Sequence, residues 1–324
     1  MFKLAHLSDP HLGPLPDPKL IQLFSKRILG YLNWRRNRSG SMTASYLEQL
    51  VEDMQAQAPD HIAVTGDLVN IALPLEIIGA RNWLEDVGEP HDVSVVPGNH
   101  DAYVPGALRR ARAAWLPYMC GDDADTTPPA PGSDAVFPYV RRRGDLAIVG
   151  VSTARASGPW FATGRVGIKQ TRRLRKILED LGKEGLFRVV MIHHPPFHNA
   201  THWHKRLSDA SRVRTVIKRV GAELILHGHT HIVSRSSIDG PDGSVPVIGV
   251  PSASNAPGGK KPGARYNLFS IFKENGRWSC QMEERGFTEK GLPVSSIVTD
   301  KIEIPASQDQ HKTPETRSVH APSV

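Results

Sequence analysis

Five short polar blocks in the sequence carry the residue types that bind metal ions. They are Asp9-Pro10-His11, Gly66-Asp67, Gly98-Asn99-His100-Asp101, His193-His194-Pro195 and Gly228-His229-Thr230-His231. Carboxylates, an Asn carbonyl and neutral imidazoles are oxygen and nitrogen donors suited to Mn, Fe or Zn, and no block contains a thiolate. This donor set predicts a site for transition metals.

Short runs rich in Val and Ile predict the strands that position these blocks. We expect strands at 2–8, 61–65, 92–96, 145–151, 187–192, 222–227, 245–250 and 265–272. Apolar residues that return every three or four positions predict helices at 43–57, 75–87, 107–119, 168–181 and 208–220. Because ligands collect at the carboxyl ends of strands in open α/β sheets, the five blocks should meet at one place.

The spacing inside the blocks fits such a meeting point. A step of two residues, as from Asp9 to His11, lets both side chains of a short turning segment reach one centre. Gly66, Gly98 and Gly228 permit tight turns or a close approach that a Cβ would obstruct.

The order of elements predicts an α/β fold. Early strands alternate with helices, which indicates parallel crossover units, whereas the closely spaced strands from about 222 to 284 indicate an antiparallel part. We interpret residues 1–284 as one catalytic domain and 285–324 as a C-terminal extension that is disordered at least from 305.

Composition places the chain among ordinary globular proteins. Of its 324 residues 39% are hydrophobic and 23% are charged. No stretch approaches the roughly 20 apolar residues that cross a bilayer. His6 and Asp9 interrupt the first apolar run before it could form a signal-peptide core, so we expect a cytoplasmic protein. The formal charge of +7 favours anionic partners without choosing among them.

A basic, apolar insertion occupies about residues 13–42. Within 18–38, Lys19, Lys26, Arg27, Arg35, Arg36 and Arg38 alternate with Leu, Ile, Phe, Tyr and Trp. Three interpretations stay open: a helix that packs its apolar face on the body, a lid over an acidic substrate, or a contact with an anionic membrane at its inner face.

In this order, the blocks D-x-H, G-D, G-N-H-D, H-x-P and G-H-x-H resemble the calcineurin-like metallophosphoesterase superfamily. The resemblance spans roughly residues 2 to 275 and implies a four-layer α-β-β-α sandwich with two packed mixed sheets. Protein Ser/Thr phosphatases of this superfamily carry an Arg soon after Gly-Asp and end the third block with Glu. Here Leu68 follows Asp67 and the third block ends in Asp101, so that class is disfavoured. The Asn-His-Asp form and the His-His-Pro-Pro run at 193–196 are more similar to bacterial class III cyclic-nucleotide phosphodiesterases and glycerophosphodiesterases.

The resemblance also implies roles for individual residues. It assigns Asp9, His11, Asp67 and His231 to one metal, and Asp67, Asn99, His193 and His229 to the other, with Asp67 as the bridge. His193 rather than His194 holds the first position of the H-x-P block. His100 corresponds to the catalytic histidine, Asp101 would orient it or a loop amide, and Asn99, His100 and His194 would contact substrate.

The cofactors implied are two divalent or mixed-valence ions, Mn²⁺, Fe²⁺/Fe³⁺ or Zn²⁺, with a metal-bound hydroxide as nucleophile. The expected function is therefore hydrolysis of a small phosphodiester of the cyclic-nucleotide or glycerophosphodiester type. The insertion leaves open a lipid-linked phosphodiester or pyrophosphate hydrolase at the membrane surface. A nuclease and a non-catalytic scaffold of the same fold are further alternatives, although nucleic acid is not the favoured partner.

Overall fold

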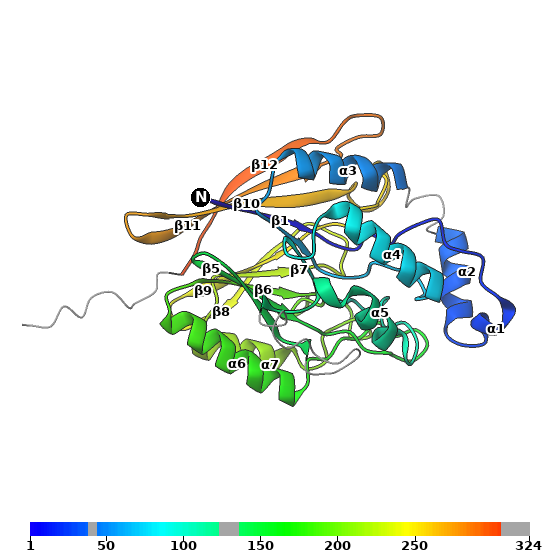
Figure 1. Ribbon diagram of the computed structural model, residues 1–324, viewed down its shortest axis with the longest axis horizontal. Coiled ribbons are helices and arrows are strands. Elements are labelled where there is room, and N and C mark those ends of the chain that lie inside the picture. The colour runs from blue at the N-terminus through cyan, green and yellow to red at the C-terminus, as the bar shows by residue number, and fades with distance from the viewer. Residues whose placement is uncertain (38–43, 123–135, 306–324) are drawn as a thin grey trace, which may run out of the picture.

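The computed structural model describes residues 1–37, 44–122 and 136–305 and contains two mixed sheets that pack face to face (Figure 1). The first sheet has the order β12 (Ser295–Ile302), β11 (Arg277–Gly286), β10 (Arg265–Glu274), β1 (Phe2–Leu7), β2 (His61–Val64) and β3 (Val93–Val95). The second has the order β4 (Tyr139–Arg143), β5 (Leu146–Val151), β6 (Phe187–Ile192), β7 (Leu224–His227), β9 (Ser244–Gly249) and β8 (Ser234–Asp239).

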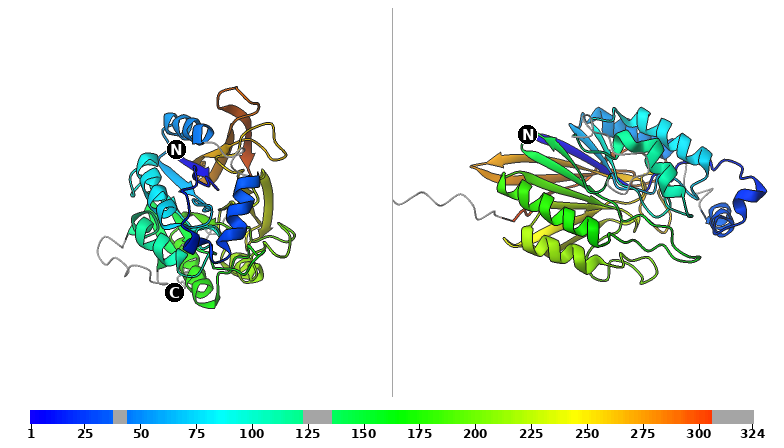
Figure 2. Two further views of the ribbon diagram at one scale, coloured as in Figure 1. Left: turned by 90° about the vertical axis from the view of Figure 1, so that its right-hand side faces the viewer. Right: turned by 60° about the horizontal axis from the view of Figure 1, so that its bottom comes forward.

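Helices cover the outer faces of both sheets. Helices α3 (Ala44–Ala56) and α4 (Pro74–Val87) lie over the first sheet, and α6 (Ile168–Lys183) and α7 (Ala210–Val220) lie over the second (Figures 1 and 2). Helix α5 (Ala107–Trp115) packs beside α4 and continues into the short 3₁₀ helix η1 (Leu116–Tyr118). The predicted α/β, four-layer fold class is confirmed.

Strand β6 is apolar except at Arg188, which is buried and pairs with Glu223 at 2.7 Å. All six of its residues are buried, and its apolar residues are divided between two cores. Val189 and Met191 lie in the core between the sheets, whereas Val190 and Ile192 lie in the core under α6 and α7. A central strand covered on both faces therefore has a nearly continuous hydrophobic sequence.

The parallel strands direct their carboxyl ends to the same edge. In the first sheet β1, β2 and β3 are parallel neighbours, and in the second β5, β6, β7 and β9 are. The predicted antiparallel part is correct for β8, β10 and β11 but wrong for β7, which pairs in parallel with both neighbours because crossover connections precede and follow it.

Four strands had no counterpart in the predicted set: β4, β8, β11 and β12. Their local signal is weak because they lie at or next to sheet edges and are exposed on one face. The ordered sheet also extends past residue 284, since β12 pairs with β11 from Cys280↔Ile302 to Gly286↔Ser295. The disorder predicted from residue 305 onward falls on 306–324, apart from 305 itself, and 306–324 lie outside the described residues. Within the described ranges, no helix is both long and apolar enough to cross a membrane.

The predicted insertion forms two helices, α1 (Leu20–Leu23) and α2 (Arg27–Asn37), at the end of the molecule opposite the N-terminus (Figure 1). One face of α2 contacts the body: the Arg27 guanidinium donates to the carbonyls of Ile71 and Ala72 at 2.9 and 2.6 Å, and Tyr31 and Trp34 pack on the main core. This face of α2 therefore packs on the body, which is one of the three interpretations left open for the insertion. Residues 38–42 of the insertion lie outside the described part.

Candidate metal centre

The loops that follow β1 and β2 are joined by backbone hydrogen bonds. The amide of Asp9 donates to the carbonyl of Gly66 at 2.9 Å, and the amide of His11 donates to Asp67 at 3.1 Å. Two blocks that lie 58 residues apart, counted from Asp9 to Asp67, are therefore fixed side by side directly after parallel strands.

Five of the seven candidate ligands have left-handed backbones. The φ angles are 52° at Asp9, 40° at His11, 54° at Asp67, 70° at His229 and 55° at His231. A side chain in this region costs about 1–3 kcal/mol and persists only where surrounding contacts hold it. Such strain clusters at functional sites, because it aims side chains where regular structure would not.

All seven candidate ligands meet at this edge. Asp9, His11 and His231 form one group whose ligand atoms lie within 4.8 Å of one another, and Asp9, Asp67 and His193 form another.

Individual contacts join the groups. Nε2 of His231 lies 3.0 Å from Asp9 Oδ1, and Nε2 of His193 lies 3.3 Å from Asp67 Oδ2. Asn99 joins through its Oδ1, 3.2 Å from His193 Nε2. His229 groups with His193 and His194 in the same way. Asp67 also groups with His11 and His100, so Asp9 and Asp67 each belong to two groups and are central to the cluster.

The histidines are oriented from behind by backbone carbonyls. Nδ1 of His193 donates to the carbonyl of Thr65 at 2.6 Å, Nδ1 of His11 to Val69 at 3.2 Å, and Nε2 of His229 to Lys205 at 2.8 Å. This arrangement fixes the tautomer and leaves the opposite nitrogen of each ring as the lone-pair donor, as is typical of histidines that bind metals. Of the adjacent pair, His193 is the one that lies against Asp67 and Asn99.

Two glycines make room for the carboxylates. A Cβ on Gly98 would lie 2.1 Å from Asp67 Oδ1, and a Cβ on Gly228 would lie 1.8 Å from Ser8 Oγ and 2.5 Å from Asp9 Oδ2. Any side chain at these positions would therefore displace a carboxylate, which is the close approach that the sequence indicated.

The buried carboxylates of the cluster favour positive charge next to them. Burial would raise the pKa of Asp9, but the imidazoles of His231 and His193 hold it below its usual range. Burial would lower the pKa of His193, yet the carboxylate of Asp67 raises it to about 9. The buried carboxylates and the imidazoles thus shift each other's pKa toward the charged forms.

One buried oxygen has no hydrogen-bond donor. Asp9 Oδ1 is fully buried and makes no hydrogen bond, although it lies among imidazole nitrogens. A buried carboxylate oxygen without a donor is costly unless a cation occupies the site. The oxygen, nitrogen and amide donors present are those of a transition-metal centre, so the residues fit the pair of ions that the sequence implied.

His100 lies at the edge of this centre and is only half-buried. Its ring packs edge-on to His11 with centroids 4.8 Å apart and stacks on Tyr103 at 5.4 Å. Its Nδ1 donates to the carbonyl of Asn70, and its amide donates to Asp67 Oδ1 at 2.7 Å. The ring is therefore held next to the cluster by groups that leave it accessible.

Asp101 is a structural anchor for the loop amides, which is one of the two roles expected for it. Its carboxylate accepts hydrogen bonds from the amides of Asp67, Leu68, Val69 and Gly98 at 2.7–3.2 Å. Burial and the charge of Asp67 raise the pKa of Asp101 to about 7, whereas these donors favour the ionised form.

His194 is buried beside His193, with Nδ1 2.7 Å from Thr153 Oγ1 and Nε2 3.1 Å from the carbonyl of Ala162. Both ring nitrogens therefore have protein partners. Its contact with substrate stays a prediction, as do the other assigned roles.

Sequence reasoning missed several supporting residues. Glu76 is buried and accepts the amides of Asn70 and Leu73 at 2.6 and 2.8 Å, and Asn70 in turn donates to the carbonyl of Leu12 at 3.0 Å. Ser252 donates to the carbonyl of Asp9 at 2.6 Å. None lies inside a block, and the only sequence signal is that Glu76 is the third residue of α4, three residues after the N-cap Leu73, which is the position of the acidic residue in a capping box.

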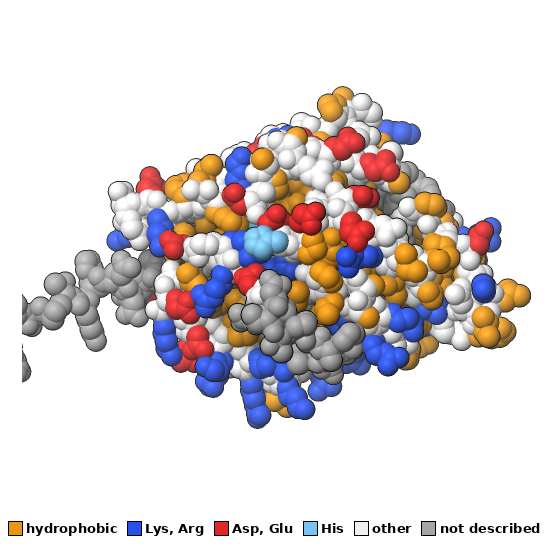
Figure 3. All heavy atoms as spheres, viewed as in Figure 1, with side chains coloured by type: hydrophobic (Ala, Val, Ile, Leu, Met, Phe, Trp, Pro, Cys, Tyr) orange, Lys and Arg blue, Asp and Glu red, His pale blue; other side chains and the backbone are white. Residues whose placement is uncertain are grey.

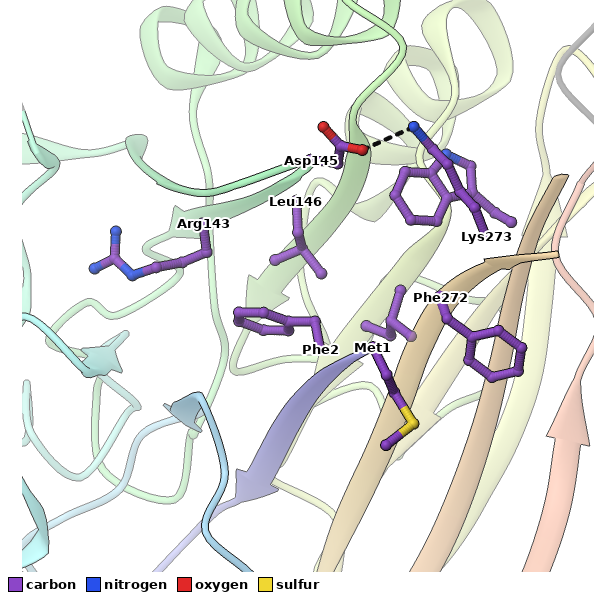
Figure 4. A pocket seen from close by; sticks show the side chains of 9 residues that line it. Met1, Phe2, Arg143, Asp145, Leu146, Phe272 and Lys273 are labelled. Carbon is purple, nitrogen blue, oxygen red and sulfur yellow. Dashed lines mark hydrogen bonds and ion pairs between the residues drawn. The ribbon is translucent and has the colours of Figure 1, made fainter. Parts of the chain in front are cut away.

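A hollow at the amino ends of the strands lacks the candidate metal ligands. It has a volume of about 320 Å³ and lies beside Phe2 and Leu146, which are at the amino ends of β1 and β5 (Figure 4). Its carboxylate, Asp145, pairs with Lys273 at 2.9 Å. No candidate ligand contributes to its wall.

Comparison with known families identifies the class to which this centre belongs. The model of the calcineurin-like phosphoesterase family matches residues 2–233, which contain all five blocks. The chain belongs to the calcineurin-like phosphoesterase family. It is accordingly a metal-dependent phosphoester hydrolase of a family that uses two metal ions.

Solved structures show the same fold at low sequence identity. A dimetal phosphatase from Danio rerio is 13% identical, with a TM-score of 0.57 over 92% of this chain and 98% of that one. The purple acid phosphatase PPD1 from yellow lupin (Lupinus luteus) is 12% identical, with a TM-score of 0.53 over 91% of this chain and 53% of that one. No curated protein sequence matched the chain.

Proposed function

We propose that this phosphoesterase hydrolyses phosphodiesters of the cyclic-nucleotide or glycerophosphodiester type with Mn, Fe or Zn ions held by the seven candidate ligands. The observation that carries the proposal is the buried pair Asp9 and Asp67, surrounded by imidazoles and contacted by no Lys or Arg in the described residues. The Asn99-His100-Asp101 block and the 193–196 run support a diester over a phosphoprotein substrate.

Each protein group has a defined task in this proposal. A bound pair of ions supplies Lewis acidity to the phosphoryl oxygens and lowers the pKa of water. Asp9, His11, Asp67 and His231 hold one ion, and Asp67, Asn99, His193 and His229 hold the other. His100, held by the Asn70 carbonyl, donates a hydrogen bond to the phosphoryl oxygens or a proton to the leaving oxygen.

A small apolar hollow beside the centre suits the organic part of such a substrate. It measures about 230 Å³ and lies between the His11 loop and helices α3 and α4, with Leu12, Leu47, Leu75 and Trp83 in its wall. A nucleoside or a glycerol derivative is of a suitable size and polarity for this space.

The decisive experiment is a substrate panel on protein reconstituted with Mn²⁺, Fe²⁺ or Zn²⁺. It contains a 3′,5′-cyclic nucleotide, a glycerophosphodiester, bis-p-nitrophenyl phosphate, a phosphomonoester and single-stranded DNA. We expect the first three to be hydrolysed fastest. Preference for the monoester or for DNA would contradict the proposal.

A second function is favoured by a specific observation at the insertion. Lys26, between α1 and α2, donates to the carbonyl of Phe161 at 2.7 Å, and its ammonium lies 4.7 Å from the centre of the Tyr103 ring that stacks on His100. The insertion therefore reaches the edge of the centre, and a lipid-linked phosphodiester or pyrophosphate is the corresponding substrate.

The variant Leu20→Ser/Phe24→Ser separates the two functions, because both residues are exposed on the insertion. If the substrate is lipid-linked, the variant slows turnover of that substrate in mixed micelles and leaves bis-p-nitrophenyl phosphate turnover unchanged. Equal micellar turnover in variant and wild type would remove the lipid-linked function.

A further inference from the structure

Large apolar side chains are exposed on three separate segments at one end of the molecule. Leu20, Ile21 and Phe24, on or directly after α1, are 80%, 79% and 88% exposed, and Trp160 and Trp203 are 77% and 66% exposed. Figure 3 shows hydrophobic side chains at the extremity formed by α1. We name these five residues the apolar rim. Single exposed apolar residues are ordinary, but a group in contacting segments marks an interaction site.

The three segments are physically connected. The Lys26 ammonium donates to Ser157 Oγ at 3.2 Å and to the Phe161 carbonyl at 2.7 Å, which ties the insertion to the loop that carries Trp160. The ring of Phe161 packs edge-on to Trp203 with centroids 5.4 Å apart, and the amide of Ala162 donates to the His204 carbonyl. The apolar rim is therefore one surface assembled from distant parts of the chain.

The charged side chains of the same segments are all Lys or Arg, apart from His. Residues 18–37, 152–170 and 193–207 contain no Asp or Glu, although acidic residues are common elsewhere in the chain. They contain Lys19, Lys26, Arg155, Lys205 and Arg206, among other basic residues. A protein partner with an apolar patch would not require this uniform sign, whereas an anionic lipid surface attracts each basic side chain near it.

The exposed apolar residues of the insertion are not confined to one helix. Ile21 lies on α1 and Phe24 directly after it, whereas Ile28 and Leu32, four residues apart on α2, are 47% and 42% exposed. The opposite face of α2, with Tyr31 and Trp34, packs on the body. The apolar outer face is thus directed to the surroundings while its helix is anchored to the fold.

We propose that the apolar rim docks this protein onto an anionic phospholipid bilayer. The rim enters the interface, and the surrounding Lys and Arg side chains contact lipid phosphates. Docking places the metal centre near the bilayer, since the rim loops also contact it: the Ala162 carbonyl bonds to His194, and the Lys205 carbonyl bonds to His229. This membrane contact goes beyond the proposed hydrolysis and does not depend on which bond is cleaved.

The test is co-sedimentation of the full chain, without substrate, with vesicles of phosphatidylcholine alone or mixed with phosphatidylglycerol. We expect binding that requires phosphatidylglycerol and weakens as salt rises. The affinity of the Leu20→Ser/Phe24→Ser variant for these vesicles should be at least about tenfold lower than that of the wild type. The matched control is Leu292→Ser/Val298→Ser, at residues that are 48% and 38% exposed before and on the edge strand β12, and it should bind as wild type does.

A second readout follows the rim tryptophans themselves. Vesicles should shift the intrinsic fluorescence to shorter wavelength, and Trp160→Phe/Trp203→Phe should abolish the shift while retaining sedimentation, because Phe is also apolar. Hydrolysis of soluble bis-p-nitrophenyl phosphate by all variants is measured separately, so failure of docking and failure of the proposed function are distinguished.

Three results would overturn the proposal. They are equal binding to vesicles with and without phosphatidylglycerol, equal binding by the wild type and the Leu20→Ser/Phe24→Ser variant, and absence of binding to either vesicle. A dimer would also overturn it. If light scattering shows a concentration-dependent dimer that the Leu20→Ser/Phe24→Ser variant abolishes, and the variant binds vesicles as the wild type does, the apolar rim binds a second copy of this chain.

Discussion

The carboxylates at the two ends of the parallel strands differ in burial and in the charge of their partners. At the amino ends, Asp145 faces the Lys273 ammonium, and both side chains are largely solvated. At the carboxyl ends, Asp9 and Asp67 are buried among imidazoles and backbone amides, with no Lys or Arg ion pair among the described residues. The charge of Asp145 is balanced by a neighbouring Lys, whereas the buried carboxylates of Asp9 and Asp67 have only neutral or titratable partners, so metal ions could balance their charge.

An Asp→Asn substitution should therefore have a large effect at the carboxyl ends and a small one at the amino ends. The largest effect is expected at Asp67. Asp67→Asn keeps the shape but removes the charge that the two candidate metal positions share. We expect about a 10³-fold or greater loss of kcat for bis-p-nitrophenyl phosphate, more than the loss of an outer partner causes. Elemental analysis by mass spectrometry should show less bound metal. Full activity with normal metal content would contradict the assignment.

His100→Ala is expected to have the next largest effect, about 10²-fold or more on kcat, because a positioned acid or hydrogen-bond donor is lost. If His100 protonates the leaving oxygen, a diester with an alkyl leaving group should lose more rate than one with p-nitrophenolate, which needs no proton. His91→Ala, at an exposed histidine, is the matched control and should leave both rates unchanged. An equal loss for both leaving groups would assign His100 to charge stabilisation alone.

Asp101→Asn tests the support of the loops. The amide has one acceptor oxygen where the carboxylate has two, so some of the four backbone amides lose their partner. We expect the free energy of unfolding to fall by about 1–3 kcal/mol and kcat to fall about 10–100-fold, as for the loss of an outer partner of a metal ligand. Thermal unfolding and steady-state kinetics measure both. Wild-type values in both assays would exclude this anchoring role.

A carboxylate with a fixed partner gives a smaller, pH-dependent effect. Asp53 accepts bonds from Arg285 at 2.8 and 2.9 Å and from the Tyr266 hydroxyl at 2.7 Å. Burial would raise its pKa, but these partners hold the pKa of Asp53 below its usual range. The stabilisation is therefore present above the unfolded-state pKa of about 4 and is lost as the pH falls through the folded-state pKa.

Asp53→Asn should thus lower the free energy of unfolding by about 1 kcal/mol at pH 7, with no change in kcat, and the difference from wild type should shrink in acid. Urea unfolding at pH 7 and below pH 4 measures it. A difference that grew in acid would reverse the sign of the assigned pKa change.

The smallest effect completes the comparison. Asp145→Asn is the same substitution as Asp67→Asn, placed at the exposed Lys273 pair. We expect less than about 0.5 kcal/mol in the free energy of unfolding and unchanged kcat and metal content. A loss of metal or activity here would show that the two ends do not differ as proposed.

The sequence determined the ligand blocks and the strands that precede them. Strand β5 carries an uninterrupted apolar run because both of its faces are covered, so its local composition reports its burial. Asp67, Asn99 and the histidines stand directly after such runs or close to them, and the carboxyl ends of parallel strands share one edge. Residue type and place together therefore predicted the centre.

The tertiary structure alone decided how these residues are held and what surrounds them. The left-handed backbones at Asp9 and His229, the Glu76 support and the edge strand β12 depend on contacts between distant segments, which no local periodicity records. The apolar rim shows the same limit. The sequence left three interpretations of the insertion open. Only the tertiary structure placed Lys26 of the insertion against the loop that carries Trp160, because segments on distant loops meet through the path of the chain and not through spacing in the sequence.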